Sequence, residues 1–126
     1  MPSAALSTSR FAARLDRAGI GLSAICAAHC ITSAVAMVAF AGFGSVLLSP
    51  IFHEVGLMIA MLLGAVALII GVWQHEFIAP FATGCFGLGI MAGALSLPHG
   101  DGELLATLVG VAVVALAHDL NYRARH

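Results

Sequence analysis

The stretch VGLMIAMLLGAVALIIGVW, residues 55–73, decides the fold, because its nineteen residues include no charged side chain. A helix of this length rises about 28 Å, which is close to the ~30 Å hydrocarbon core of a lipid bilayer. Lipid offers the backbone no hydrogen-bond partners, so a segment that crosses it closes its hydrogen bonds internally as a helix. The stretch therefore predicts a transmembrane helix.

The composition extends this prediction to the whole chain. Of its 126 residues, 61% are hydrophobic and 9% are charged, and the mean hydropathy is +1.06. A soluble domain has about a quarter of its residues charged, so lipid is the expected solvent. We predict an all-α membrane protein, a bundle of four transmembrane helices over about residues 18–43, 55–73, 77–97 and 104–120. The expected divisions are an N-terminal segment, a transmembrane domain and a tail, at 1–15, 16–121 and 122–126.

The basic residues indicate how the chain is oriented. All five are arginines near the ends of the sequence, at Arg10, Arg14, Arg17, Arg123 and Arg125. Basic residues that flank transmembrane helices concentrate on the cytoplasmic side, so we expect both termini in the cytoplasm and a multi-pass chain with an even number of spans. Residues 1–15 are interpreted as a juxtamembrane segment rather than a transit or cleaved signal peptide. The net charge of −1 and the lack of a basic patch give no reason to expect nucleic acid.

The stretch CAAHC, residues 26–30, carries the most reactive side chains of the chain within the first apolar run. On a helix, Cys26 and Cys30 lie one turn apart with Cβ atoms about 5–6 Å from each other, whereas a disulfide needs about 3.5–4.5 Å. The spacing therefore favours a metal ion held between two thiols, with His29 beside them. Thiolates select soft or borderline metals such as copper(I), zinc and mercury(II). Cys26 follows Arg17 by nine residues, about 13–14 Å, which places the pair near the middle of the membrane.

Further candidate ligands share a stripe with these thiols or lie near the ends of the predicted spans. The stripe recurs every seven residues on the first helix, at Asp16, Ser23, Cys30 and Met37, with Gly19, Cys26 and Ser33 between them. A seam between packed helices is the competing interpretation of this stripe. Cys85 has the same expected depth as the pair and is a third sulfur ligand if the first and third helices are neighbours. The remaining candidates for metal binding are imidazoles near the span ends, at His53, His75 and His118.

Small residues distinguish the third predicted span. It contains Gly84, Gly87, Gly89 and Gly93. Small residues let transmembrane helices approach each other closely, so we interpret them as packing positions, either within one chain or between two copies. Because four short helices make a thin-walled bundle, a homodimer is one of the expected assemblies.

Several of these residues together are typical of one known family. They are Asp16-Arg17-x-Gly19, Ser23 and Cys26-x-x-His29-Cys30 in the first span, His53-Glu54 and His75 around the second, and Ala117-His118-x-x-Asn121 at the end of the fourth. Over about residues 15–121 the chain resembles the MerC family of small four-helix membrane proteins from bacterial mercury-resistance systems. The resemblance implies mercuric-ion uptake across the inner membrane, with Cys26 and Cys30 taking the ion and passing it to cytoplasmic thiols. The mercury-operon protein of that family looks to have a second cysteine pair in a longer cytoplasmic tail, whereas this chain has no cysteine after Cys85 and more closely resembles other proteins with a MerC domain. Here we therefore expect the handover to use His75, His118 or an external thiol.

The sequence thus predicts a carrier of a soft metal ion, mercuric ion first, with zinc or copper(I) as the alternatives. No permanent cofactor is expected, and the expected partners are the metal ion, the lipid bilayer and periplasmic or cytoplasmic thiol carriers. A quinone-linked membrane thiol oxidoreductase is the enzymatic alternative, which we disfavour because the chain has no Cys-x-x-Cys motif and its close cysteines are deep. A non-transporting accessory membrane protein is the third hypothesis.

Overall fold

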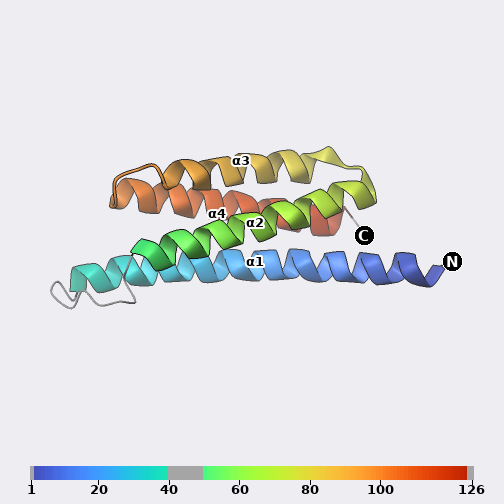
Figure 1. The fold of residues 1–126 in the computed structure, drawn as a ribbon, viewed down its shortest axis with the longest axis horizontal. Coiled ribbons are helices and arrows are strands. Elements are labelled where there is room, and N and C mark those ends of the chain that lie inside the picture. The colour runs from blue at the N-terminus through green and yellow to red at the C-terminus, as the bar shows by residue number, and fades with distance from the viewer. Residues whose placement is uncertain (1, 40–49, 125–126) are drawn as a thin grey trace.

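The computed structural model describes residues 2–39 and 50–124, and in these ranges all regular structure is helical. The four described helices are α1 (Pro2–Ala39), α2 (Pro50–His75), α3 (Ile78–Ala94) and α4 (Asp101–Arg123) (Figure 1). The prediction of an all-α fold with four helices is confirmed. Among the described residues, Glu54–His75 and Asp101–Arg123 are long and apolar enough to cross a membrane, and Ile78–Ala94 is a shorter apolar helix.

The helix ends differ from the predicted bounds for local reasons. The first helix begins at Pro2 rather than near residue 18, because Pro is tolerated in a first turn and no Gly or Pro follows before Gly19. The second begins at Pro50, again a proline in the first turn. The third ends at Ala94, three residues before the predicted 97, because Ser96 and Leu97 already make turn hydrogen bonds to Gly93 and Ala94 ahead of Pro98. Positions 40–43 of the first predicted span lie outside the described residues.

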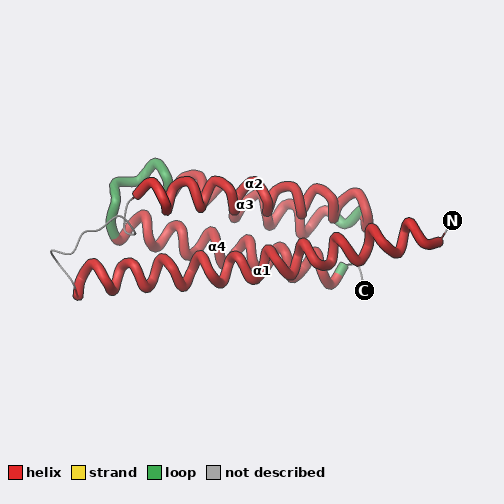
Figure 2. Tube along the Cα trace, turned by 60° about the horizontal axis from the view of Figure 1, so that its bottom comes forward, coloured by secondary structure: helices red, strands yellow, loops and turns green. Residues whose placement is uncertain are grey.

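The helices form a bundle in which α1 packs against α2 and α4, and α3 packs against the same two helices. α1 and α3 therefore occupy opposite corners, with α2 and α4 between them, as Figures 1 and 2 show from two directions. The beginning of α1 and the end of α4 lie at the same end of the bundle, and α1 extends beyond the other helices there (Figure 1). Successive helices run in opposite directions, so α1 and α4 are antiparallel neighbours.

The core lies where α3 and α4 approach most closely. A Cβ atom on Gly110 would lie 3.0 Å from the Met91 backbone nitrogen and 3.1 Å from the Gly87 carbonyl oxygen. Beside this contact lies a buried apolar cluster of Leu57, Met91, Val111 and Val114. The glycines of α3 divide into two sets: Gly84 and Gly87 pack within the chain, whereas a Cβ at Gly89 or Gly93 would meet nothing within 4 Å.

The outward surface of the bundle is apolar and bulky. Exposed side chains on α2 include Ile59, Leu62, Leu63 and Trp73, of which Trp73 is 81% exposed. A soluble monomer rarely exposes so continuous an apolar surface. The surface is therefore the one expected of helices that face hydrocarbon rather than water.

The glycine contacts predict unequal effects of the same substitution on α3. Gly87→Ala places a methyl group 2.9 Å from the Val114 backbone nitrogen and is expected to lower the free energy of unfolding by about 1–3 kcal/mol. Gly89→Ala is the matched control and is expected to be neutral or stabilising by up to about 1 kcal/mol, because alanine favours helix. Thermal unfolding in detergent, followed by circular dichroism, measures both. Equal destabilisation by the two changes would contradict this packing.

Candidate functional site

The two predicted thiol ligands lie on the packed side of α1. Cys26 and Cys30 lie one helical turn apart and are not in a disulfide; Cys26 is half-buried, and Cys30 is buried with 6% of its surface exposed. Cys26 packs against the buried cluster formed with Val111 and Val114 of α4. The pair therefore faces the interior of the bundle. His29 is exposed and lies on a different side of the helix from Cys30.

The seven-residue stripe of α1 follows the same packed side. Asp16, Ser23 and Cys30 are all buried, and Gly19 and Cys26 between them are half-buried. The stripe is thus a helix–helix seam, and the seam also aligns a carboxylate, a hydroxyl and two thiols along the inside of one helix. The side chain of Met37, the last member, lies outside the described part of the structure.

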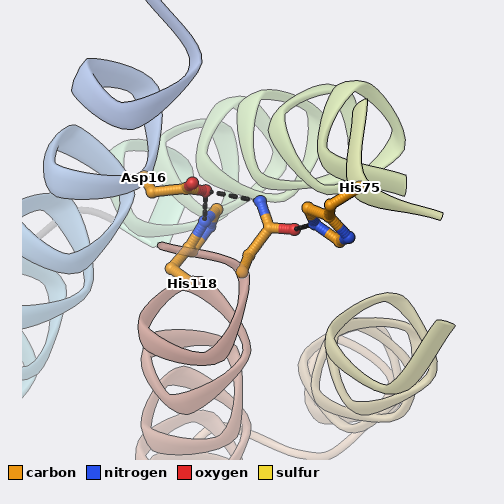
Figure 3. A network of polar contacts seen from close by, with 4 residues as sticks. Asp16, His75 and His118 are labelled. Carbon is orange, nitrogen blue, oxygen red and sulfur yellow. Dashed lines mark hydrogen bonds and ion pairs between the residues drawn. The ribbon is translucent and has the colours of Figure 1, made fainter. Parts of the chain in front are cut away.

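A network of four polar side chains closes one end of this seam, and we call it the Asp16 network (Figure 3). Asp16 of α1 has no exposed surface and lies opposite His118 of α4, which is 1% exposed. Asp16 Oδ1 is 3.1 Å from His118 Nδ1 and accepts a hydrogen bond of 2.8 Å from Asn121 Nδ2. Asn121 Oδ1 in turn lies 2.7 Å from Nε2 of His75 on α2. The network therefore links three helices.

The hydrogen bonds of the network define which ring nitrogens carry protons. His75 Nδ1 accepts from the Phe77 backbone N–H at 3.1 Å, so its Nε2 carries the proton that is donated to Asn121 Oδ1. Asp16 Oδ1 accepts from the Asn121 amide, and the same oxygen accepts from His118 Nδ1–H. Both nitrogens of His75 are thus engaged. His118 engages only Nδ1, since its Nε2 makes no hydrogen bond to any described residue.

Glycines make the room that the network needs. A Cβ atom on Gly19 would lie 2.6 Å from His118 Nε2, and one on Gly71 would overlap the amide of Asn121. Gly64 of α2 is also close, with its Cβ position 3.6 Å from His118 Nε2. A larger residue at Gly19 or Gly71 would displace a side chain that holds Asp16. The three glycines of α1 and α2 therefore leave the space that His118 and Asn121 of α4 occupy.

An aromatic contact strengthens the same end of the bundle. Arg17 Nη2 donates a hydrogen bond of 2.8 Å to the Tyr122 hydroxyl, and its guanidinium carbon lies 5.2 Å from the centre of the Tyr122 ring. This distance is within the range of a cation–π interaction. α1 and α4 are thus joined by neighbouring residues of both helices, inside the bundle by Asp16 and at its surface by Arg17.

A second polar group lies at the opposite end, and we call it the His99 cluster. His99 Nδ1 is 3.0 Å from Glu103 Oε2, and its Nε2 is 4.0 Å from Glu54 Oε1. Cys30 follows Asp16 by 14 residues and Glu103 precedes His118 by 15 residues, rises of about 21 and 22 Å along antiparallel helices. The Cys30 thiol and the Glu103 carboxylate therefore come level along the two helices. The seam thus runs from the His99 cluster, past the thiols, to the Asp16 network.

The structure does not bring the other predicted ligands to the thiols. Cys85 is exposed on α3, which lies diagonally across the bundle from α1. We expected it to be a third sulfur ligand only if the first and third helices were neighbours, and they are not. The His53 side chain lies outside the described part of the structure. Among the described residues, no group of three or more His, Cys, Asp or Glu side chains is arranged to hold a metal ion. Among the described candidates, Cys26 and Cys30 are thus the two that lie together on α1, and the Asp16 network is a separate group.

Sequence reasoning named the acid and both histidines of the network but not how they are joined. The role of Asn121 as the bridge, and the room left by Gly64 and Gly71, were not predicted. His118 and Asn121 lie three residues apart and therefore share one face of a helix, which was the available signal for the pair. The glycines of α2 carried no such signal, because their function depends on which helix packs opposite them.

A comparison with known protein families matches the part of the chain that contains these site residues. The family model described as MerC mercury resistance protein matches residues 16–123. The chain belongs to this family. The matched region begins at Asp16 and includes every member of the network, the dithiol and the His99 cluster. No curated protein and no solved structure matches the chain. The family is one of mercury-resistance proteins, and the apolar helices of this member are those of a membrane protein.

The network predicts a large effect for its bridging residue and none for a buried hydroxyl elsewhere on α4. Asn121→Ala leaves both Asp16 and His75 short of a hydrogen bond and is expected to lower the free energy of unfolding by about 1–3 kcal/mol. Thr107 on α4 is the control, because its buried hydroxyl has no hydrogen-bond partner in the described structure. Thr107→Val is expected to be neutral or stabilising. Detergent unfolding measures both, and a less stable Thr107→Val than Asn121→Ala would contradict the assignment.

Proposed function

We propose that this MerC-family chain is an integral membrane carrier of a soft metal ion, with mercuric ion as its first substrate and Cys26 and Cys30 as its ligands. The observation that carries the proposal is that Cys26 and Cys30 lie one turn apart on the packed side of α1 and that neither is in a disulfide. Two sulfur atoms at this spacing can share one ion without distortion of the helix. The family supports mercury in particular.

The proposed chemistry explains why thiols are placed in an apolar interior. A mercuric ion that is bound by two thiols forms two sulfur–metal bonds and releases two protons, one from each thiol, so the bound form carries no net charge. A bare divalent ion would pay a large desolvation penalty in the same place. Metal binding deprotonates thiols even where they would otherwise remain neutral. The dithiol therefore replaces the hydration shell of the ion at the middle of the bundle.

The proposed topology has four spans, with both termini in the cytoplasm and the His99 cluster on the far side of the bacterial inner membrane. The beginning of α1 and the end of α4 lie at one end of the bundle, and the arginines of the sequence are concentrated in the same two segments. This arrangement agrees with the cytoplasmic bias of basic residues. An ion from outside would then meet Glu54, His99 and Glu103 before it meets Cys30.

We propose a carrier rather than an enzyme because of the geometry of the thiols. A redox cycle needs the two sulfurs to form a disulfide, and cysteines four residues apart on a regular helix are held too far from each other for that bond. Zinc and copper(I) remain alternative substrates, because thiolates also bind these metals.

Uptake of radiolabelled mercuric ion by cells that express the chain tests the proposal. The double variant Cys26→Ser/Cys30→Ser is expected to lower uptake to the level of cells without the protein, and to remove the added mercury sensitivity that uptake causes. Cys85→Ser is the matched control, because Cys85 is exposed on α3, and it is expected to retain wild-type uptake. Equal amounts of each variant in the membrane must be verified by immunoblot.

Undiminished uptake by the double variant would refute the dithiol mechanism. Competition by excess zinc or copper(I) in the same assay identifies the substrate, and we expect neither to suppress mercury uptake as strongly as unlabelled mercuric ion does. Stronger suppression by zinc or copper(I) would assign the site to that metal instead.

A further inference from the structure

Thr107 carries a buried hydroxyl that the packing of the bundle leaves unpaired. The residue lies on α4 with no exposed surface, and its Oγ1 has no hydrogen-bond partner among the described residues. A buried hydroxyl without a partner costs free energy. A threonine in a helix can avoid this cost by donating to the carbonyl one turn back, as Thr83 of α3 does to the Ala79 carbonyl at 2.9 Å. Thr107 makes no such bond, so its hydroxyl can donate to another group.

Thr107 lies on the face of α4 that packs toward the thiols. Val111 and Val114 follow it by four and seven residues, and residues at these spacings share one face of a helix. Both valines belong to the buried cluster against which Cys26 of α1 packs. Thr107 therefore lies on the same face, one turn nearer the beginning of α4. Because α1 and α4 are antiparallel, Cys30 is displaced from Cys26 in the same direction.

The register of α1 and α4 brings Thr107 to the level of the two thiols. Asp16 and His118 lie opposite each other on the two helices. Cys26 and Cys30 follow Asp16 by 10 and 14 residues, about 15 and 21 Å along α1. Thr107 precedes His118 by 11 residues, about 16–17 Å along α4, so its height lies between those of the thiols. Side chains lean toward the N-terminus of their own helix, so those of Thr107 and Cys30 lean toward each other.

A sulfur that holds a metal ion is a better partner for such a hydroxyl than a thiol is. The sulfur of a protonated thiol accepts hydrogen bonds only weakly. When the thiol gives up its proton to bind an ion, its sulfur becomes a thiolate, and hydrogen bonds to ionised acceptors are stronger than those between neutral groups. Hydrogen bonds to the ligands of a metal orient these ligands and tune how tightly the metal is bound.

We propose that Thr107 is a positioning residue of the dithiol site, whose hydroxyl donates a hydrogen bond to the Cys30 sulfur when that sulfur holds the metal ion. The inference rests on the proposed carrier function, and it adds a group from α4 to two ligands that both come from α1. The hydrogen bond stabilises the loaded site more than the thiol form, so it raises the affinity for the ion. Thr107 keeps its own proton throughout, and the exchange of one divalent ion for two thiol protons is unchanged.

The affinity of the purified chain for mercuric ion, in detergent and in competition with glutathione as a soluble thiol, measures the effect. A Cys85→Ser background leaves only the two thiols of the site. In this background, Thr107→Val removes the hydroxyl and keeps the shape of the side chain, and it is expected to lower the affinity at least about tenfold. Thr107→Ser retains the hydroxyl and is expected to retain most of the affinity.

Thr83→Val is the matched control, because Thr83 lies on α3 and its hydroxyl already donates to its own helix. This change is expected to leave the mercury affinity as it is. A wild-type affinity of Thr107→Val, or an equal loss in Thr83→Val, would overturn the proposal. A loss in Thr107→Ser as large as that in Thr107→Val would overturn it too, because serine still offers the hydroxyl.

Unfolding with and without mercuric ion separates a role at the site from a role in packing. Without the ion, Thr107→Val is expected to be at least as stable as the parent chain, because it removes an unpaired hydroxyl. With one mercuric ion per chain, the same variant is expected to unfold at a lower temperature than the loaded parent. Equal destabilisation in both forms would show a packing role only and would overturn the proposal.

The double variant Cys26→Ser/Cys30→Ser, measured in the same competition assay, distinguishes this proposal from the carrier function. If the double variant loses mercury binding while Thr107→Val keeps the parent affinity, the role of Thr107 fails and the carrier proposal stands. If the double variant binds mercuric ion as tightly as the parent chain, the dithiol site fails, and the role of Thr107 fails with it.

Discussion

A carboxylate with no exposed surface, on Asp16, accepts hydrogen bonds from His118 and Asn121 across the contact between α1 and α4. In an apolar bundle an unsatisfied buried carboxylate would be very costly, so these bonds fix which faces of the two helices meet. The antiparallel register of α1 and α4 that follows determines which other residues of the seam lie opposite each other. Cys30 comes level with Glu103 along the two helices, and Cys26 lies against the buried apolar cluster of α2, α3 and α4.

The seam has a chemical order that follows from this register. Carboxylates and an imidazole lie at one end, thiols in the middle, and an imidazole held by a carboxylate at the other end. Each group is one that binds metal ions, and each differs in softness from the next. Neither the apolar composition nor helix packing alone requires such an order, because small apolar residues would pack α1 against α4 equally well. The match to the family of mercury-resistance proteins covers all three groups.

The sequence was sufficient for features that depend on local chemistry. The uncharged run of residues 55–73 predicted α2, and the one-turn spacing of Cys26 and Cys30 predicted two thiols on one side of α1. Features that depend on which helices are neighbours could not be predicted from the sequence. Cys85 was a candidate ligand on depth alone, and only the diagonal placement of α1 and α3 separates it from the other thiols. The bridge made by Asn121 and the open space at Gly64 likewise exist only once α4 lies against α1 and α2.

X-ray absorption spectroscopy of the mercury-loaded Cys85→Ser protein tests the central claim most directly, because it identifies the atoms bound to the ion. With one mercuric ion per chain and no other thiol in the protein, two sulfur neighbours at equal distance are the predicted first shell, from Cys26 and Cys30 of the same monomer. A single sulfur neighbour completed by nitrogen or oxygen would contradict the dithiol. Two sulfurs found only in a cross-linked dimer would contradict it equally, since the ion would then join two chains instead of occupying the interior of one.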